Sequence, residues 1–234
     1  MPELRESADK NRNTLFPIFL KLEQLTILLI GGGNVAHEKL TALLHNCPGA
    51  SVKVVATDIS PAVRALIDLY RIPFECRTFQ EQDLAGIDLV MIAINDKTVS
   101  AAIHSICKKN RLLTNVADTP AYCDFYLSSI VQKGSMKIAI STNGKSPTIA
   151  KRVKEVLNET FPEELEEVLN NMGKIRNTLK GDFSQKVRHL NEITRGLASP
   201  GATYKRRSKK ALWFISGVAA TLAFLSLLYV AFYF

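Results

Sequence analysis

Short apolar runs alternate with stretches of helical spacing over about the first 115 residues of the chain. Three runs, 25–30 (LTILLI), 52–56 (VKVVA) and 89–94 (LVMIAI), are typical of strands that are buried on both faces. A further strand is predicted at 112–116, and the stretches between the runs predict helices. Strands that alternate with helices imply right-handed crossovers and a parallel sheet. The sequence therefore predicts an α/β fold with a Rossmann-like parallel sheet.

The pattern changes in the second half of the chain. Two strand-like runs, 125–131 and 136–141, follow one another with only a turn-prone segment between them, which predicts a paired β element. From Pro147 to Leu197 apolar residues recur at helical spacing, which predicts a small helical domain. The segment that follows, up to about residue 204, has the composition of a flexible connection.

The last 24 residues, 211–234, carry no charged side chain. As a helix they would be about 36 Å long, enough to cross a hydrocarbon core of about 30 Å. The basic residues just before them favour the cytoplasmic side of a membrane, and the polar first 15 residues contain no secretory signal. The sequence therefore predicts that the main part of the chain is cytoplasmic and is anchored by a C-terminal transmembrane helix. The alternative is a terminal helix buried in a protein core.

Charge and cysteine content exclude two classes of protein. The net charge is +8, but five of the 30 Lys and Arg residues lie at 205–210 and no Asp or Glu lies beyond position 204. The rest of the chain is nearly neutral, so nucleic-acid binding is not predicted. The four cysteines form no CxxC pair and have no His at metal-site spacing. We therefore predict reduced thiols and no zinc or redox motif, and the sequence identifies no metal ligands.

Residues 31–36 (GGGNVA) form a G-x-G-x-x-A motif between the first predicted strand and the next helix. In such a motif the glycines let the backbone approach a pyrophosphate, and the helix N-terminus attracts the anion. Asp58 lies at the end of the second strand, where a carboxylate binds ribose hydroxyls and disfavours the extra phosphate of NADP. Gly31, Gly33 and Asp58 together predict an NAD site. The alternative is a structural turn in a domain that binds another ligand.

Two further segments carry candidate chemistry. Residues 115–118 (NVAD) end a predicted parallel strand, at the edge where open α/β sheets bind ligands. Asp118 can act there on a substrate proton, although an Asp at a strand end is also a common cap. Residues 141–147 (STNGKSP) precede a helix, for which Ser146 and Pro147 are favourable first residues. Lys145 beside that helix N-terminus predicts an anion-binding corner.

Four ordered motifs carry a resemblance to a known family. They are LFPIFLKLEQLTILLIGGGNVAHEKL at 15–40, NVAD at 115–118, CDFYLSSIVQKG at 123–134 and IAISTNGKSPTIAKRVKE at 138–155. Over about residues 14–195 the chain resembles the precorrin-2 dehydrogenase family, also described as the amino-terminal part of siroheme synthase. Members oxidise precorrin-2 to sirohydrochlorin with NAD, and some also insert ferrous iron to give siroheme. The resemblance implies this NAD-dependent oxidoreductase activity, and it leaves the ferrochelatase activity open.

The resemblance also implies roles for individual residues. The dinucleotide-contacting positions of the family match Asn34 and Val35 after the glycines, and Thr57 and Asp58 at the second strand end. Asp118 matches an acid implicated in proton handling, and we expect it to be the general base. Because precorrin-2 carries many carboxylates, we predict these substrate-binding residues: Asn115, Lys145 and Ser146.

The expected organisation follows from both lines of reasoning. The predicted parts are an NAD-binding Rossmann domain at 14–117, a dimerisation and substrate region at 118–146, a helical domain at 147–197, a linker and basic collar at 198–210 and a transmembrane anchor at 211–234. A homodimer is implied by the resemblance. No methyltransferase module follows the helical domain, so we expect precorrin-2 to come from another protein.

Two other functions remain open. A membrane-anchored NAD-sensing regulatory module would explain the glycine motif and the anchor, and it predicts that no tetrapyrrole binds. A nonenzymatic tetrapyrrole carrier would bind sirohydrochlorin without any turnover of NAD. Neither alternative accounts for all four motifs as well as the dehydrogenase does.

Overall fold

The computed structural model describes residues 13–162, 165–178 and 182–194. Two compact units divide between Glu166 and Glu167, and each is described by itself. The predicted linker with its basic collar, 198–210, and the predicted transmembrane segment, 211–234, lie outside the described residues. Among the helices that are described, none combines the length and the apolar character needed to span a bilayer. The domain boundaries given above stay predictions.

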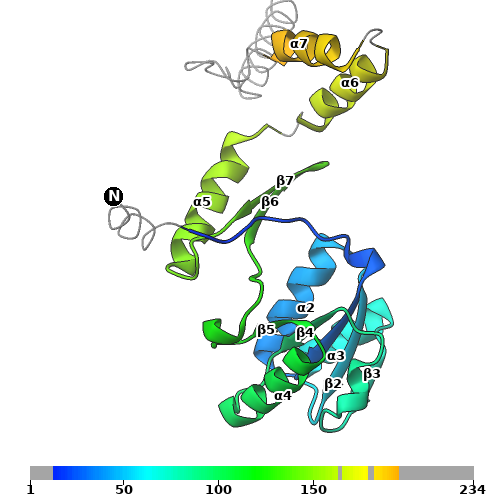
Figure 1. The fold of residues 1–234 in the computed structure, drawn as a ribbon, viewed down its shortest axis with the longest axis vertical. Helices are drawn as coiled ribbons and strands as arrows, with labels where there is room; N and C mark the ends of the chain where they lie inside the picture. Colours follow the sequence, from blue (N-terminus) through cyan, green and yellow to red (C-terminus); the bar gives the residue numbers. More distant parts are fainter. Residues whose placement is uncertain (1–12, 163–164, 179–181, 195–234) are drawn as a thin grey trace, which may run out of the picture. The chain divides into compact units, whose positions relative to one another are not determined.

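Five parallel strands form the central sheet of the first unit, in the order β3-β2-β1-β4-β5 (Figure 1). The sheet consists of β1 Thr26–Ile30, β2 Ser51–Ala56, β3 Phe74–Cys76, β4 Leu89–Ile92 and β5 Leu113–Val116. Ile30 pairs with Val55 on β2 and with Ile92 on β4, so the carboxyl ends of the central strands lie side by side. The predicted Rossmann-like sheet is confirmed. The edge strand β3 was not predicted, because its three residues are too few for a visible pattern and none of them is buried.

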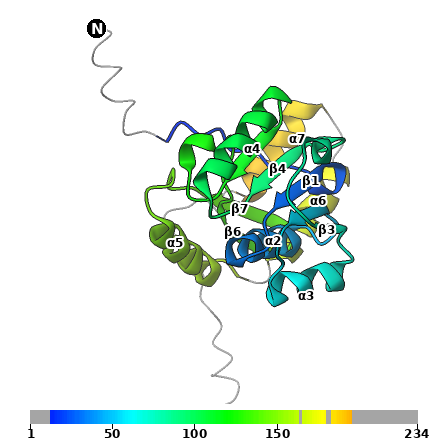
Figure 2. The ribbon, with the colours of Figure 1, turned by 90° about the horizontal axis from the view of Figure 1, so that it is seen from below.

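Helices cover both faces of this sheet (Figure 2). Helices α2 Asn34–Asn46 and α3 Pro61–Tyr70 pack on one face, where Leu29 of β1 contacts a cluster that includes Leu40 and Ile67. Helix α4 Lys97–Lys109 packs on the other face, where Leu28 belongs to a cluster with Ile103. Three short 3-10 turns are η1 Leu22–Gln24, η2 Glu81–Leu84 and η3 Pro120–Tyr122. Burial on both faces explains why the strands are continuous apolar runs.

A separate antiparallel hairpin, β6 Ser129–Lys133 and β7 Met136–Ile140, follows the parallel sheet in the chain. Helix α5 Pro147–Thr160 packs against it, with Val131 and Ala150 buried. The predicted β element is confirmed, but its first strand begins at Ser129 and not at residue 125. Residues 124 and 125 are held against β5 instead, because the Asp124 N–H donates to the Thr114 carbonyl oxygen at 2.8 Å.

Two more helices follow, α6 Leu165–Thr178 and α7 Phe183–Thr194. Both lie within the stretch for which helical spacing predicted helices. Their sequences are amphipathic, and α6 has no buried residue among those that the structure describes. A helix that buries so little of its apolar face gains little stability from packing.

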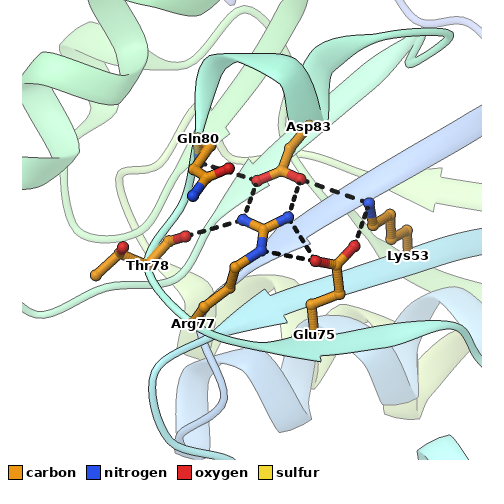
Figure 3. A network of polar contacts seen from close by, with 6 residues as sticks. All are labelled: Lys53, Glu75, Arg77, Thr78, Gln80 and Asp83. Carbon is orange, nitrogen blue, oxygen red and sulfur yellow. Dashed lines mark hydrogen bonds and ion pairs between the residues drawn. The ribbon is translucent and has the colours of Figure 1, made fainter.

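Charged side chains tie the edge strand β3 to its neighbours (Figure 3). The Arg77 guanidinium donates to both carboxylate oxygens of Asp83, at 2.8 and 2.6 Å, and its Nε donates to Glu75 at 2.6 Å. Lys53 on β2 lies 2.9 Å from the other Glu75 oxygen. Asp83 is only 5% exposed, and the hydrogen bonds from Arg77 lower its pKa to about 2. Polar contacts therefore hold a strand that has little apolar surface to bury.

Candidate active site

Two glycines at the end of β1 are required by close backbone contacts. Gly31 has φ +121°, and a Cβ there would lie 2.2 Å from the carbonyl oxygen of Ala93, just after β4. A Cβ on Gly32 would lie 2.1 Å from the carbonyl oxygen of Asp58. Side chains are therefore excluded at both positions. The loop is wedged between the segments that follow β2 and β4.

The start of α2 is open, in contrast to the starts of the next helices. Gly33 is the N-cap of α2 and provides no side-chain hydrogen bond, whereas Ser60, Asp96 and Ser146 cap α3, α4 and α5 with their side chains. A Cβ on Gly33 would meet no heavy atom within 4 Å. The first N–H groups of α2 are thus left for an outside acceptor, at the positive end of the helix dipole. This geometry fits the pyrophosphate of a dinucleotide.

The other predicted cofactor residues surround this loop. Asn34 and Val35 form the first turn of α2, with Asn34 exposed and Val35 half-buried. Thr57 and Asp58 are exposed in the segment after β2, and the backbone of Asp58 is the one that crowds Gly32. The structure therefore brings the two cofactor motifs together. Their contacts with a dinucleotide stay predictions.

Asp118 lies beyond the carboxyl end of β5, at the same edge of the sheet. It is exposed and has φ +54°, a left-handed conformation that Asp tolerates better than most residues. The preceding N–H, that of Ala117, donates to the carbonyl oxygen of Ile92 at 2.9 Å and keeps the chain beside β4 up to this point. The acid that was predicted to handle a proton therefore stands at the ligand-binding edge.

The segment after Asp118 returns to β5 and is fastened there. The Sγ of Cys123 accepts from the N–H of Val116 at 3.3 Å, and Asp124 accepts from the N–H of Thr114 at 2.9 Å. Burial raises the pKa of Asp124, but hydrogen bonds from Lys108 and Thr114 outweigh it and bring the pKa below its usual value. The loop that carries Asp118 is thus closed at its base by polar contacts.

Sequence reasoning missed Lys39, which the tertiary structure places against the end of β5. Its ammonium donates to the Oδ1 of Asn115, a buried residue that is 76 positions away along the chain. Burial lowers the pKa of Lys39, although the charge of Asp118 acts in the opposite direction. A signal was present in the sequence, because Lys39 stands between the apolar residues Val35 and Leu43 at helical spacing.

Lys145 and Ser146 lie in the turn between β7 and α5. The Oγ of Ser146 accepts from the N–H of Ile149 at 3.2 Å and so caps α5, while Lys145 is exposed. Asn143 and Gly144 give the turn its shape, with φ +55° and +74°. Within the described residues no hydrogen bond or ion pair joins this turn to residues 115–118. The structure confirms that a helix, α5, starts at Pro147. It does not bring the motif at 141–147 into contact with the motif at 115–118.

A cavity of about 530 Å³ lies between α2, β6 and α5. His37, Thr41 and His45 line it from the outer face of α2. Ser129 lines it from β6, and Lys154 and Asn158 line it from α5. Over the part of the chain that the structure describes, no group of three or more His, Cys, Asp or Glu residues is placed to hold a metal ion.

Two models of known protein families match this chain. The model "Putative NAD(P)-binding" matches residues 18–129, and the model "Sirohaem biosynthesis protein central" matches residues 133–159. Over these two regions the chain is similar to siroheme synthases and to precorrin-2 dehydrogenase. The resemblance seen in the four motifs is thereby confirmed, and so is the nucleotide-binding domain.

Relatives and a solved structure agree with this family. Siroheme synthase of Baumannia cicadellinicola subsp. Homalodisca coagulata is 32% identical over 164 residues, which are 70% of this chain and 35% of that protein. Siroheme synthase of Methylococcus capsulatus is 34% identical over 146 residues, 62% of this chain and 30% of that protein. The chain thus spans about a third of these curated relatives. The structure of SirC, precorrin-2 dehydrogenase, matches with a TM-score of 0.60 and 26% identity, covering 76% of this chain and 89% of that one.

Proposed function

We propose that this protein oxidises precorrin-2 to sirohydrochlorin with NAD as the hydride acceptor. The observation that supports this most strongly is the juxtaposition at one sheet edge of an uncapped glycine loop and an exposed acid, Asp118, in a chain with both family regions. The likeness to SirC, precorrin-2 dehydrogenase, supports the same substrate, since the match covers most of that chain.

The chain's residues have separate tasks in this reaction. The dinucleotide, when bound, supplies the acceptor for a hydride that leaves a carbon of the substrate, and the products are sirohydrochlorin, NADH and a proton. The N–H groups at the start of α2 hold the pyrophosphate, and Asp58 binds the ribose hydroxyls. The carboxylate of Asp118 takes up the proton that the substrate loses.

The carboxylates of precorrin-2 need several hydrogen-bond donors. The cavity beside α2 offers the side chains of Lys154, Asn158 and His37, and it begins one turn after the glycine loop. Lys145 and Ser146 complete the proposed set of substrate-binding residues, whereas the amide of Asn115 is buried and already bonded to Lys39 and Phe125. Charge-assisted hydrogen bonds of this kind are stronger than neutral ones, so they suit a substrate with many acidic groups.

Insertion of ferrous iron into sirohydrochlorin is a second proposed activity. Here iron is a substrate, and the protein has to accept the two protons that the pyrrole nitrogens release. Asp118 is the residue proposed for this task as well, because it is exposed at the carboxyl edge of the parallel sheet.

The assay that tests the dehydrogenase uses the full chain in mild detergent, without oxygen, with enzymatically made precorrin-2 and either NAD or NADP. NADH formation together with the sirohydrochlorin spectrum is the expected result, with NADP the poorer acceptor because of Asp58. Asp118→Asn, which tolerates the same backbone conformation, should lower kcat about 100- to 10,000-fold with unchanged NAD affinity. Asp68→Asn on α3, an exposed position, is the matched control.

Three results would contradict this proposal in different ways. Full activity of Asp118→Asn would remove the proton-accepting role. Binding of NAD without binding of any tetrapyrrole would favour the sensor, and binding of sirohydrochlorin without NADH formation would favour the carrier. Addition of ferrous iron then tests the chelatase, which requires siroheme to form faster than it does without the protein.

Membrane attachment through residues 211–234 is proposed from their uncharged sequence and from the basic cluster at 205–210. The catalytic part would then face the cytoplasm. After cell breakage the full chain should sediment with membranes and resist extraction by salt, whereas a chain that ends at residue 204 should stay in the supernatant. Recovery of the active full chain wholly in the soluble fraction would refute the anchor.

A further inference from the structure

Lys39 has a setting that is unusual for a lysine on a surface helix. It is half-buried on α2, and burial of an ammonium is costly unless the group is paired. Among the described residues no carboxylate lies within ion-pair distance of its Nζ, although exposed lysines elsewhere in the domain have such partners. Its hydrogen-bond acceptor is the neutral amide oxygen of Asn115.

Asn115 is held at both ends of its side chain. Its Oδ1 accepts from Lys39, and its Nδ2 donates to the carbonyl oxygen of Phe125 at 2.8 Å. These two contacts fix the orientation of a buried amide on β5, three residues before Asp118. Lys39 therefore connects α2, which begins at the glycine loop, with the strand end that carries the acid.

The charge of Lys39 also interacts with ionisable groups near the end of β5. The ionisable groups whose charges act on its ammonium are Cys123, Asp118 and Glu38, in that order of strength. Lys39 thus brings a positive charge to the part of the sheet edge where Asp118 lies. A neutral side chain of the same length would keep the packing and lose this effect.

We propose that Lys39 is a positioning residue for the reaction, which orients Asn115 and ties α2 to the end of β5 that precedes Asp118. This inference rests on the proposed dehydrogenase function. Lys39 needs no contact with the cofactor or the substrate for either task.

The test compares Lys39→Met and Lys39→Arg with Lys109→Met, which removes an exposed positive charge from the end of α4. The full chain in detergent is assayed with precorrin-2 and NAD from pH 5 to pH 9. Lys39→Met should lower kcat about 10- to 100-fold, with KM and NAD affinity changed much less. Lys39→Arg should recover most of kcat, and Lys109→Met should match the wild type.

A purely structural role predicts another pattern. It would lower the amount of folded protein while kcat per folded molecule stayed at the wild-type value, and that result overturns the proposal. Equal loss in Lys39→Arg and Lys39→Met would also overturn it, because the Arg variant retains both the charge and the donor.

Hydrogen exchange separates this inference from the proposed function. If the wild type forms no NADH from precorrin-2 that another dehydrogenase can oxidise, the proposed dehydrogenase function is refuted. The contact between Lys39 and Asn115 is then tested by the hydrogen exchange of amides 115–125. Lys39→Met should then speed their exchange at least tenfold while the amides of β2 are unchanged. Unchanged exchange at 115–125 overturns the role of Lys39 whether or not the wild type is active.

Discussion

Three successive glycines, Gly31, Gly32 and Gly33, precede α2, and each has a different neighbourhood. A side chain on Gly31 or Gly32 would collide with the carbonyl oxygens of Ala93 and Asp58, whereas one on Gly33 would meet no protein atom within 4 Å. The first two positions are thus constrained by the fold itself. The third is left open by the fold, so a requirement for glycine there must come from a ligand.

Substitution by alanine separates these two requirements. Gly32→Ala should lower the free energy of unfolding by about 1–3 kcal/mol, because a backbone segment has to move. Gly33→Ala should cost no more than about 1 kcal/mol as a change of N-cap residue, yet it should weaken NAD binding at least tenfold. Urea unfolding and calorimetric titration with NAD measure the two effects. Unchanged NAD affinity in Gly33→Ala would show that the pyrophosphate does not approach this position.

At the scale of elements, β3 shows how a short edge strand is kept in place. Its three residues bury little, and the Arg77–Asp83 pair instead connects the segment after β3 with η2. Asp83 contributes most here, because it is buried and accepts three hydrogen bonds from Arg77 and the N–H of Gln80. Breaking a buried pair on one side leaves the other charge without its partner, which is costly.

The lowered pKa of Asp83 makes this contribution depend on pH. Its pKa is about 2 in the folded protein, against 3.8 as the ordinary value, so the stabilisation is complete above about pH 4 and is lost as the pH falls toward 2. The shift corresponds to about 2 kcal/mol. Asp83→Asn should lower the free energy of unfolding by about this amount at pH 7, and the difference from the wild type should vanish near pH 2. Asp68→Asn, in an exposed pair with Arg64, should change it by less than about 0.5 kcal/mol at either pH.

At the scale of the molecule, the first unit carries large apolar side chains that are exposed and do not belong to its core. Phe16, Ile18 and Phe19 of the segment before β1 are 86%, 60% and 67% exposed, and Ile149 and Val156 on α5 are similarly exposed. The hairpin β6–β7 adds a two-stranded sheet whose outer edges have no strand partner among the described residues. Surfaces of this kind mark protein interfaces. We propose that a second copy of the chain covers them.

Sedimentation of the full chain in detergent tests this homodimer. The protein part should have twice the 25.9 kDa mass of the chain. Phe16→Asp combined with Phe19→Asp should give a monomer, because two charges would be buried without partners. Leu69→Asp, at an exposed position on α3, should stay dimeric. A monomeric wild type at micromolar concentration would refute the proposal.

The local pattern of the sequence determined much of this protein. Buried strands have continuous apolar runs and their helices have amphipathic spacing, so the sheet and its crossovers were predictable. The glycine motif, Asp58 and Asp118 were also visible, because each follows a strand and parallel strands end at one edge of the sheet. The family followed from four motifs in order. Each of these motifs is a continuous stretch of sequence, so it can be recognised without knowing which distant residues it contacts.

Tertiary structure decided what depends on partners far apart in the chain. β3 is a strand because its backbone pairs with β2, and ion pairs of Lys53 and Asp83 hold the side chains around it. No periodicity in three residues predicts this pairing. A strand was predicted to start at residue 125, but residues 124 and 125 are bound to β5 instead. Lys39 became a candidate only when the fold placed its ammonium against Asn115. Hydrogen bonds of this kind join groups that sequence spacing does not relate, so only the folded chain brings them together.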